Sequence, residues 1–163
     1  MKILILNPGA TSTKIAVYDG ENEEFAESIS HSQEELAGFS RILDQLPLRE
    51  SLVRGALSRA GYSARDFAAV CSRGGLIRHI PSGTYEISDA VIRDIYNPPY
   101  GEHASSLGPV IARSIANEAG IPALLVDPPS VDELTPLARV SGLKGMERES
   151  FFHALNQKAV ARK

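Results

Sequence analysis

The chain has 163 residues, of which 43% are hydrophobic and 23% are charged, and its formal net charge at pH 7 is −3. This length allows one domain with a sizeable core, and the composition excludes a disordered, collagen-like or coiled-coil protein. The slightly acidic balance and the absence of any run of Lys or Arg argue against a nucleic acid partner.

Cysteine content and hydropathy bear on the compartment. Cys71 is the only cysteine, so an internal disulfide is impossible and a disulfide-stapled secreted scaffold is excluded. The apolar run at the start ends at Asn7, far short of the roughly 18 residues that a membrane span requires, and it lacks the cleavage site of a secretory signal. We therefore expect a cytoplasmic protein without a membrane partner.

The first residues have the pattern of three strands. Residues 2–6 are apolar and partly β-branched, which predicts a buried strand, and residues 14–19 and 24–29 also have β character. Asp19-Gly20 is a strong hairpin turn signal between the second and third segments. We expect three antiparallel strands to open the domain.

Helical periodicity follows. Ser32 and Glu35 form a capping-box pattern, and the apolar residues after them predict a helix that ends at Pro47. A second helix is expected to begin at Leu48 and to stop at Gly61 in a left-handed conformation. Residues 67–71 then predict a fourth, buried strand.

In the second half, strands are predicted at residues 84–87 and 122–126, and helices are predicted between them at 89–96 and 107–119. Gly108-Pro109 is expected to kink the helix at 107–119 or to delay its start. The order of elements predicts an α/β fold of the ribonuclease H-like type, with a mixed β-sheet flanked by helices.

Two further helices are predicted near the end of the chain. Ser130 and Glu133 repeat the capping-box pattern, which predicts a helix at 131–138, and another is expected from Glu149 onward. No Gly, Asn or Pro ends that last helix before Lys163, so we expect a truncated chain.

The sharpest chemical feature is the polar turn at residues 7–14, Asn-Pro-Gly-Ala-Thr-Ser-Thr-Lys. Its backbone N–H groups, hydroxyls, amide and ammonium suit an oxyanion such as phosphate, with contacts expected from Asn7, Gly9, Thr11, Ser12 and Lys14. It is not a P-loop, because the second glycine of that motif is missing and a strand follows. An ordinary hairpin turn is the alternative, since such turns use the same residue types.

Polar residues also follow two predicted strands. Arg73 precedes Gly74 and Gly75, which allow a ligand to approach the backbone closely, although a surface arginine beside a turn is the alternative. Asp127 is expected at the sheet edge, where it can position a magnesium ion directly or through water, and an ordinary loop-starting Asp is the alternative. No Cys and His spacing of the zinc type is present.

The four histidines form two pairs. His31 and His79 have no polar companions in the sequence that indicate a site, and we interpret them as solvated or capping residues. His103 lies in a Pro- and Gly-rich loop before a helix, and His153 follows two phenylalanines near a helix start. For either of these alone, a structural hydrogen-bonding role is the commoner interpretation.

Five motifs taken together resemble the butyrate kinase branch of the acetate kinase family, and the resemblance runs from the first residue to the last. The motifs are Asn7-Pro-Gly-Ala-Thr-Ser-Thr-Lys14, Arg73-Gly-Gly75, His103, Val126-Asp127 and Phe152-His-Ala-Leu-Asn-Gln-Lys-Ala-Val-Ala-Arg162. Members of the family have two lobes of the sugar kinase and actin superfamily fold. The resemblance therefore implies that residues 1–163 are the amino-terminal lobe of a two-lobe kinase.

The resemblance implies reversible transfer of the γ-phosphoryl group of ATP, with magnesium, to butyrate, giving butanoyl phosphate. It implies catalytic roles for four residues: Arg73, His103, Asp127 and His153. Arg73 would hold the acyl carboxylate, the two histidines would donate to the phosphoryl oxygens, and Asp127 would position magnesium, while the polar turn, Gly74 and Gly75 bind substrate or phosphate. A carboxylate with a pKa of about 4 to 5 is already ionised at pH 7, so it needs charge neutralisation and no general base.

The chain departs from the family pattern at three points. Ala10 replaces a serine that relatives commonly have, which removes one hydroxyl from the turn. Val70 lies where the acetate kinase branch has its substrate arginine, so Arg73 is expected as its substitute. The carboxyl-terminal lobe, which in relatives supplies the adenine site, a glycine-rich phosphate loop and a second arginine, is missing.

The missing lobe leads to three expectations. The isolated chain is expected to be inactive, and it is expected to self-associate through the exposed surface that relatives bury between their lobes. The full-length protein is expected to form a homo-oligomer. Other possibilities remain open: a kinase for acetate, propionate, a branched acid such as isobutyrate or a sugar, a non-catalytic ligand-binding module, or a fragment that works with a separately encoded second lobe.

Overall fold

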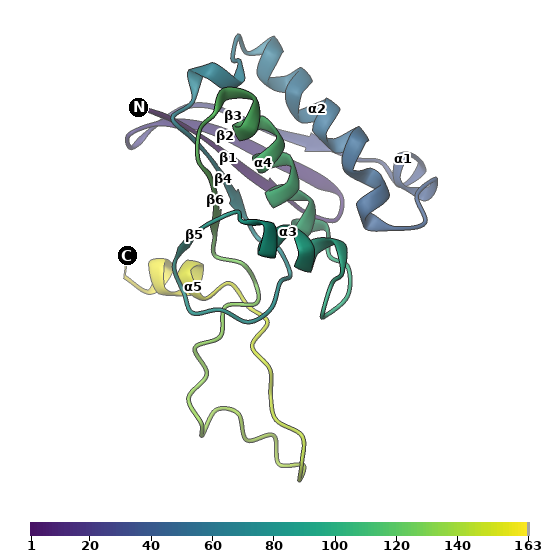
Figure 1. Cartoon of the computed structure of the whole chain (residues 1–163), viewed down its shortest axis with the longest axis vertical. Helices are drawn as coiled ribbons and strands as arrows, with labels where there is room; N and C mark the ends of the chain where they lie inside the picture. Colours follow the sequence, from purple (N-terminus) through teal and green to yellow (C-terminus); the bar gives the residue numbers. More distant parts are fainter. Residues whose placement is uncertain (163) are drawn as a thin grey trace.

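The computed structural model describes residues 1–162, which contain a six-stranded sheet in the order β3-β2-β1-β4-β6-β5 (Figure 1). The strands are β1 (Lys2–Pro8), β2 (Ser12–Asp19), β3 (Asn22–Ser30), β4 (Ala69–Arg73), β5 (Thr84–Glu86) and β6 (Ala123–Val126). The first three strands are antiparallel, β1, β4 and β6 are parallel, and β5 is antiparallel to β6. The sheet is therefore mixed, and the predicted α/β class and antiparallel opening are confirmed.

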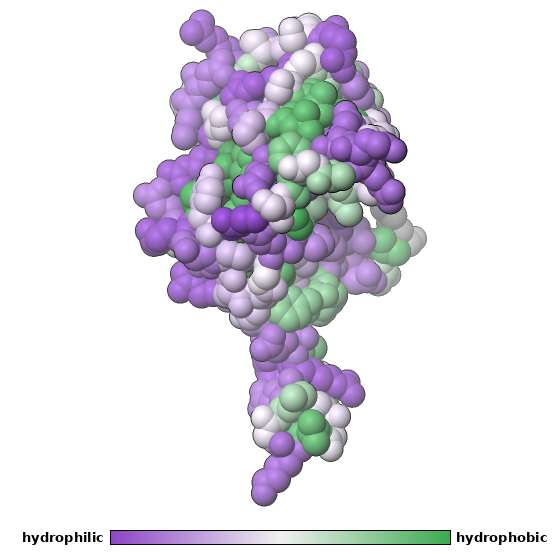
Figure 2. All heavy atoms as spheres, turned by 90° about the vertical axis from the view of Figure 1, so that its right-hand side faces the viewer, coloured by the Kyte–Doolittle hydropathy of each residue, from purple (hydrophilic) through white to green (hydrophobic). Residues whose placement is uncertain are grey.

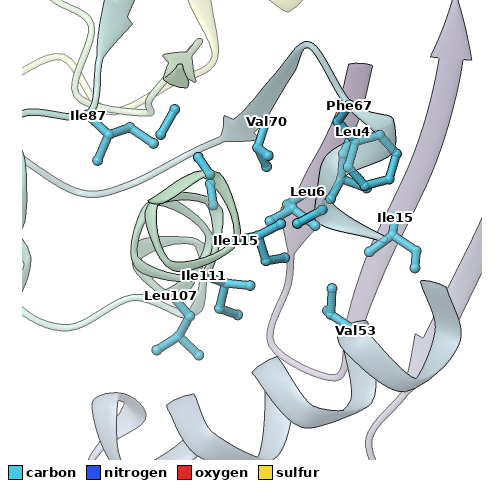
Figure 3. Packing of buried hydrophobic residues seen from close by; sticks show 14 of the residues in the cluster. Leu4, Leu6, Ile15, Val53, Phe67, Val70, Ile87, Leu107, Ile111 and Ile115 are labelled. Atoms are coloured by element: carbon cyan, nitrogen blue, oxygen red, sulfur yellow. The ribbon is translucent and has the colours of Figure 1, made fainter. Parts of the chain in front are cut away.

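Two helices, α2 (Leu46–Arg59) and α4 (Leu107–Ala119), cover one face of the sheet (Figure 1). Side chains alternate along β1, so Leu4 and Leu6 are fully buried on this face while Ile3 and Ile5 point to the other. Figure 3 shows Leu6 packed close to Ile115 of α4, in the cluster that also includes residues of α2. Burying an aliphatic side chain of this size stabilises the fold by about 1.5–3 kcal/mol.

The region after β3 differs from the single predicted helix. The capping box of Ser32 and Glu35 is present, but α1 (Gln33–Ala37) ends at Gly38, and a short 3₁₀ helix (Ile42–Gln45) leads into α2. Pro47 lies in the first turn of α2 and does not end a helix, so that prediction was wrong. The first turn of a helix tolerates proline because the N–H that proline lacks has no intrahelical partner there.

Glycines in the left-handed conformation end both long helices, and the stop at Gly61 was predicted. Gly61 has φ +82°, and the N–H of Tyr62 donates to the carbonyl of Leu57 at 2.8 Å, which closes α2 as expected for a left-handed stop. Gly120 ends α4 in the same conformation, with φ +65°. α4 begins at Leu107 without delay, because Pro109 falls within its first turn.

The predicted helix at 131–138 is wrong, because these residues are irregular. The two groups of the expected capping box are used elsewhere: the Ser130 hydroxyl accepts the N–H of Ile77, and Glu133 pairs with Lys158. Pro136 would also interrupt a helix at this place. The last helix, α5 (Ala154–Ala161), begins later than the predicted start at Glu149.

The segment between β6 and α5 makes a long excursion from the body of the protein, drawn in light green and yellow-green in Figure 1. Figure 2 shows apolar surface on the knob at its end, where Leu137, Leu143 and Met146 are exposed. The remaining elements are α3 (Asp89–Tyr96) and two 3₁₀ helices, Ala64–Asp66 and Ala104–Ser106. Within residues 1–162, no helix combines the length and apolar character that a bilayer crossing needs.

The contact between α4 and the sheet depends on Gly108. A Cβ atom added there would lie 2.3 Å from Oγ of Ser72 and 2.9 Å from Cδ of Pro8. We expect Gly108→Ala to lower the free energy of unfolding by about 1–3 kcal/mol through overpacking, measured by chemical denaturation. Gly55→Ala is the matched control in α2, where the nearest atom is the flexible Arg59 side chain at 3.5 Å, and it should stabilise by up to about 1 kcal/mol. Equal effects of the two substitutions would contradict this packing.

Candidate functional site

Polar side chains gather on the sheet face opposite α2 and α4, at one end of the central strands. Asn7 and Lys14 are cross-strand partners of β1 and β2. β1 and β4 pair in parallel with Leu6 beside Ser72, so the next residues of the two strands, Asn7 and Arg73, are also neighbours. Because side chains alternate, these residues point away from the face on which Leu6 is buried. The register therefore brings together three predicted site residues from three strands.

Most polar side chains of the turn have no partner within the chain. Among the hydrogen bonds and ion pairs of residues 1–162, none involves the side chains of Asn7, Thr11, Ser12 or Lys14. Lys14 and Thr11 are exposed, and Asn7 and Ser12 are half-buried. These donors are thus available to a ligand.

The backbone of the turn is also arranged to leave donors free. The N–H of Gly9 donates to the carbonyl of Ser12 at 2.7 Å, so the Gly9 amide is already used. Ala10 and Thr11 lie outside the strands, and within the described chain their N–H groups have no hydrogen-bond acceptor. A phosphate at this turn would therefore meet the Ala10 and Thr11 amides and not that of Gly9.

A residue that the sequence prediction missed, Arg49 of α2, lies behind the turn. Its side chain is fully buried and donates to the carbonyls of Gly9 at 2.8 Å and Ala10 at 2.9 Å. The available signal was its position four residues before Val53, which places an arginine on the apolar stripe of α2.

Arg73 lies beside Asp127 at the end of β4. Arg73 pairs with Val126 in the neighbouring strand, and its Nη2 is 3.6 Å from Oδ2 of Asp127. At that distance the contact is an ion pair and not a hydrogen bond. No hydrogen bond within residues 1–162 is donated by the Arg73 guanidinium, so its planar set of N–H groups is available to a carboxylate.

Asp127 directly follows β6 and connects the end of this strand to α5. Its buried carboxylate accepts the N–H of Leu155 at 2.9 Å and that of Asn156 at 3.3 Å, in the first turn of the helix. A negative charge at this position complements the helix dipole. Asp127 also has φ +50°, in the left-handed region that non-glycine residues rarely adopt. Asp127 thus combines an unfavourable backbone conformation with hydrogen bonds to the first turn of α5, at a predicted catalytic residue.

His153 is held by the same residue. Nδ1 of His153 lies 2.7 Å from the carbonyl oxygen of Asp127 and 3.4 Å from its Oδ2. A carbonyl only accepts, so Nδ1 must carry a hydrogen, and the neutral ring presents an unprotonated Nε2. His153 can therefore donate from Nε2 to a phosphoryl oxygen only in its charged form.

His103 has the opposite arrangement. Its Nδ1 accepts the N–H of Ser105 at 3.2 Å and lies 2.8 Å from the Ser105 hydroxyl. Nδ1 must therefore be unprotonated in the neutral ring, and Nε2 carries the hydrogen. The exposed His103 ring thus presents a donor without having to be charged.

Gly74 and Gly75 connect these groups through packing. Both have positive φ, and a Cβ at Gly74 would lie 2.6 Å from Cβ of Ser105. The N–H of Gly75 donates to the Ser105 hydroxyl at 3.2 Å. The glycines therefore let the strand end approach the His103 segment, and within residues 1–162 no hydrogen bond or ion pair joins His103 to Arg73, Asp127 or His153.

The interpretation of His31 and His79 as solvated or capping residues is wrong. His31 is only 4% exposed, and its Nε2 is 2.9 Å from Oγ1 of Thr13. His79 binds the carbonyl of Ser130 through Nδ1 at 3.0 Å and packs against the rings of Tyr100 and Phe151. Both contacts are between residues far apart in sequence, which explains why local patterns did not reveal them.

A magnesium ion at Asp127 would have to be held through water and not by direct coordination. Within residues 1–162, no group of three or more His, Cys, Asp or Glu side chains is arranged to hold a metal ion. Each Asp127 carboxylate oxygen already accepts a backbone N–H, and Arg73 is adjacent. These residues fit a magnesium ion that keeps its water and phosphate ligands better than one coordinated directly.

The fold resembles that of solved carboxylate kinases. An acetate kinase of Porphyromonas gingivalis superimposes with a TM-score of 0.64 and 16% identity over 99% of this chain and 47% of its own. An acetate kinase from Entamoeba histolytica gives a TM-score of 0.60 with 14% identity over 99% of this chain and 45% of its own. A propionate kinase from Francisella tularensis subsp. tularensis SCHU S4 gives a TM-score of 0.59 with 14% identity over 99% of this chain and 47% of its own.

The chain has an acetate kinase-like fold. This likeness confirms the predicted sheet with flanking helices as the fold of these kinases. The chain spans about half the length of the structures it matches. No model of a known protein family matches the sequence.

The two histidines of this acetate kinase-like fold are predicted to have opposite neutral tautomers. At alkaline pH, ¹⁵N-detected NMR should show the hydrogen on Nε2 of His103 and on Nδ1 of His153, because each Nδ1 has a partner that fixes its role. Ser105→Ala removes the hydroxyl but keeps the backbone donor and is expected to leave the His103 tautomer predominantly unchanged. The same tautomer for both histidines would contradict the hydrogen bonds described above.

Stability should depend on the protonation of His31. Burial, followed by the charge of Arg49, lowers the pKa of His31 from its ordinary value of 6.5, and Glu35 opposes this only in part. The unfolded chain therefore takes up this proton more readily, so the stabilisation is complete above about pH 6.5 and is lost as the pH falls toward the folded-state pKa. Chemical denaturation at about pH 7.5 and about pH 5.5 should show a larger loss for the wild type than for His31→Gln. An equal loss in both proteins would rule out this role of His31.

Proposed function

We propose that the chain forms half of the active site of a kinase that transfers the γ-phosphoryl group of ATP to a short-chain carboxylate, with butyrate as the substrate. The observation that carries this proposal is the adjacency of Asn7, Lys14 and Arg73 at one end of the central strands, beside Asp127. All four belong to the motifs on which the resemblance to butyrate kinases rests.

The geometry suits a reaction between two anions. A carboxylate is ionised at neutral pH, so the barrier comes from charge repulsion and in-line alignment and not from proton removal. Lys14, the Asn7 amide and the Ala10 and Thr11 N–H groups are assigned to the phosphoryl oxygens. The Thr11 and Ser12 hydroxyls, which have no hydrogen-bond partner within residues 1–162, are assigned to the same oxygens.

Arg73 is assigned to the acyl carboxylate. Its guanidinium is restrained by Asp127 but donates no hydrogen bond within residues 1–162, which leaves it able to bind a carboxylate through two parallel N–H groups. Val70, on the face packed against α4, is fully buried and cannot take that role. Gly74 and Gly75 are assigned the positioning of this arginine relative to the His103 segment.

His103, His153 and Asp127 complete the assigned site. His103 donates from Nε2 in its neutral form, and His153 is oriented by Asp127 and donates only when charged. Magnesium, when bound with its water shell near Asp127, neutralises charge on the phosphate oxygens. The ATP-binding groups that complete such a site are assigned to a second lobe, and a homo-oligomer of the two-lobe protein remains part of the proposal.

Selection of the substrate by the length of its acyl chain is assigned to a cavity of about 430 Å³ that opens beside His103. Leu76, Tyr100, Pro129 and Phe151 supply most of its lining, and His103 and Glu149 supply the polar part. A cavity of this composition favours an alkyl chain over a sugar, which needs several hydrogen-bonding partners. The similar structures are named acetate and propionate kinases, so the length of the preferred acid has to be measured by comparing acids.

The carboxylate assignment is tested by butyrate binding to this chain. We expect Arg73→Gln to weaken butyrate binding about 10- to 150-fold, the loss of about 1.5–3 kcal/mol for a charge-assisted contact, measured by NMR titration. Arg65→Gln is the matched control, because Arg65 is an exposed arginine in the short helix before β4. Butyrate that shifts resonances remote from Arg73 and His103 would contradict the proposal.

The reaction itself is tested by trapping the acyl phosphate with hydroxylamine. We expect no ATP-dependent hydroxamate from the 163-residue chain and robust formation from a protein that also carries the second lobe. Comparing acetate, propionate, butyrate and isobutyrate in the two-lobe protein would identify the preferred acid, with butyrate expected to have the highest kcat/KM. Acyl phosphate formation by the chain alone would refute its assignment as a half-site.

A further inference from the structure

Arg49 is a buried charge without a countercharge. Its side chain is 0% exposed, and its hydrogen-bond acceptors within residues 1–162 are backbone carbonyls, one hydroxyl and one amide, none of them a carboxylate. Burial of an ion costs free energy unless the environment compensates it. Five neutral acceptors must therefore compensate the buried positive charge, which a carboxylate commonly does.

Every N–H of the guanidinium has an acceptor. Nε and Nη2 both donate to Oε1 of Gln45, at 3.1 and 2.9 Å, and Nη2 also donates to the Ala10 carbonyl at 2.9 Å. Nη1 donates to the Gly9 carbonyl at 2.8 Å, with longer contacts to the Ser12 carbonyl at 3.4 Å and to the Thr13 hydroxyl at 3.3 Å. One side chain of α2 thus holds four positions of the turn, Gly9, Ala10, Ser12 and Thr13 being bound and only Thr11 skipped.

This contact decides where the free amides point. In a trans peptide the C=O and the following N–H point in opposite directions. Drawing the carbonyls of Gly9 and Ala10 toward Arg49 therefore turns the N–H groups of Ala10 and Thr11 away from it. These are the two amides of the turn that have no acceptor within residues 1–162.

We propose that Arg49 is the positioning residue of the anion-binding turn: it fixes the Ala10 and Thr11 N–H groups toward the ligand and places a permanent positive charge behind them. The role rests on the proposed function of the turn and deepens it. Arg49 touches no substrate, because the turn lies between its buried guanidinium and the surface on which Lys14 is exposed.

Inorganic phosphate binding to the ¹⁵N-labelled chain tests this role. In the wild type, phosphate should shift the Ala10 and Thr11 amide resonances, and Arg49→Met should weaken phosphate affinity about tenfold or more because it removes both the charge and the carbonyl contacts. Arg49→Lys keeps the charge but cannot bind every carbonyl, so we expect an intermediate affinity. Arg54→Ala is the control on the same helix, since Arg54 forms surface ion pairs with Glu50 and Glu118, and phosphate affinity should not change.

Chemical rescue separates positioning from general stability. Millimolar guanidinium chloride should restore phosphate affinity and the Ala10 and Thr11 amide shifts in Arg49→Ala, and should not do so in Lys14→Ala, whose missing charge lies on the ligand side. A substitution that merely loosens the fold would not regain phosphate affinity with added guanidinium. If Arg49→Met does not fold, Arg49→Lys and the rescued Arg49→Ala carry the comparison.

The outcomes distinguish the two proposals. Phosphate binding at the turn with equal affinity in the wild type, Arg49→Met and Arg49→Lys overturns the role of Arg49 and leaves the proposed function standing. An absence of rescue by guanidinium, with Arg49→Ala folded, also overturns it. Phosphate that leaves the turn amides of the wild type unshifted overturns the anion-binding turn itself, and with it both proposals.

Discussion

The structure depends on the separation of the two faces of one sheet. α2 and α4 bury one face under aliphatic side chains, and this packing fixes the register of β1, β2 and β4. A slip of one residue would move Leu6 out of the core and Asn7 into it, at a cost of several buried side chains. The same apolar packing that stabilises the domain therefore aligns Asn7, Lys14 and Arg73 on the opposite face.

Asp127 links this alignment to the end of the chain. Its carbonyl holds His153, its carboxylate caps α5, and Arg73 lies within ion-pair distance. The 26-residue separation between Asp127 and His153 is bridged by these contacts, so the intervening excursion needs no regular structure to bring the two together. Asp127 adopts its positive φ where it directly follows β6 and also caps the first turn of α5.

Positive charge occurs in two settings around the turn. Lys14 and Arg73 lie on the sheet face opposite α2 and α4 without hydrogen-bond partners in residues 1–162, so their donors are free to bind an anion. Arg49 is buried on the helix side and is satisfied by the backbone of the turn itself. The nearby His31 stays neutral more readily because burial and Arg49 lower its pKa, which avoids a second buried positive charge.

Elements whose signals are local could be predicted from the amino-acid sequence alone. The three opening strands, the capping box at Ser32 and the left-handed stop at Gly61 depend on side-chain alternation, on neighbours three residues apart or on glycine at positive φ, and all are present. The residues that carry the family resemblance are likewise identifiable from their motifs alone, and their roles are proposals.

Contacts between residues far apart in the chain could be known only from the folded structure. Ser130 and Glu133 form no cap because Ile77 and Lys158 bind them, and the buried His31 has a hydrogen-bond partner in Thr13 of β2. The role of Arg49 likewise could not be found locally, because the turn carbonyls of Gly9 and Ala10 that it binds lie about 40 residues earlier in the chain and become adjacent only when α2 packs against the sheet.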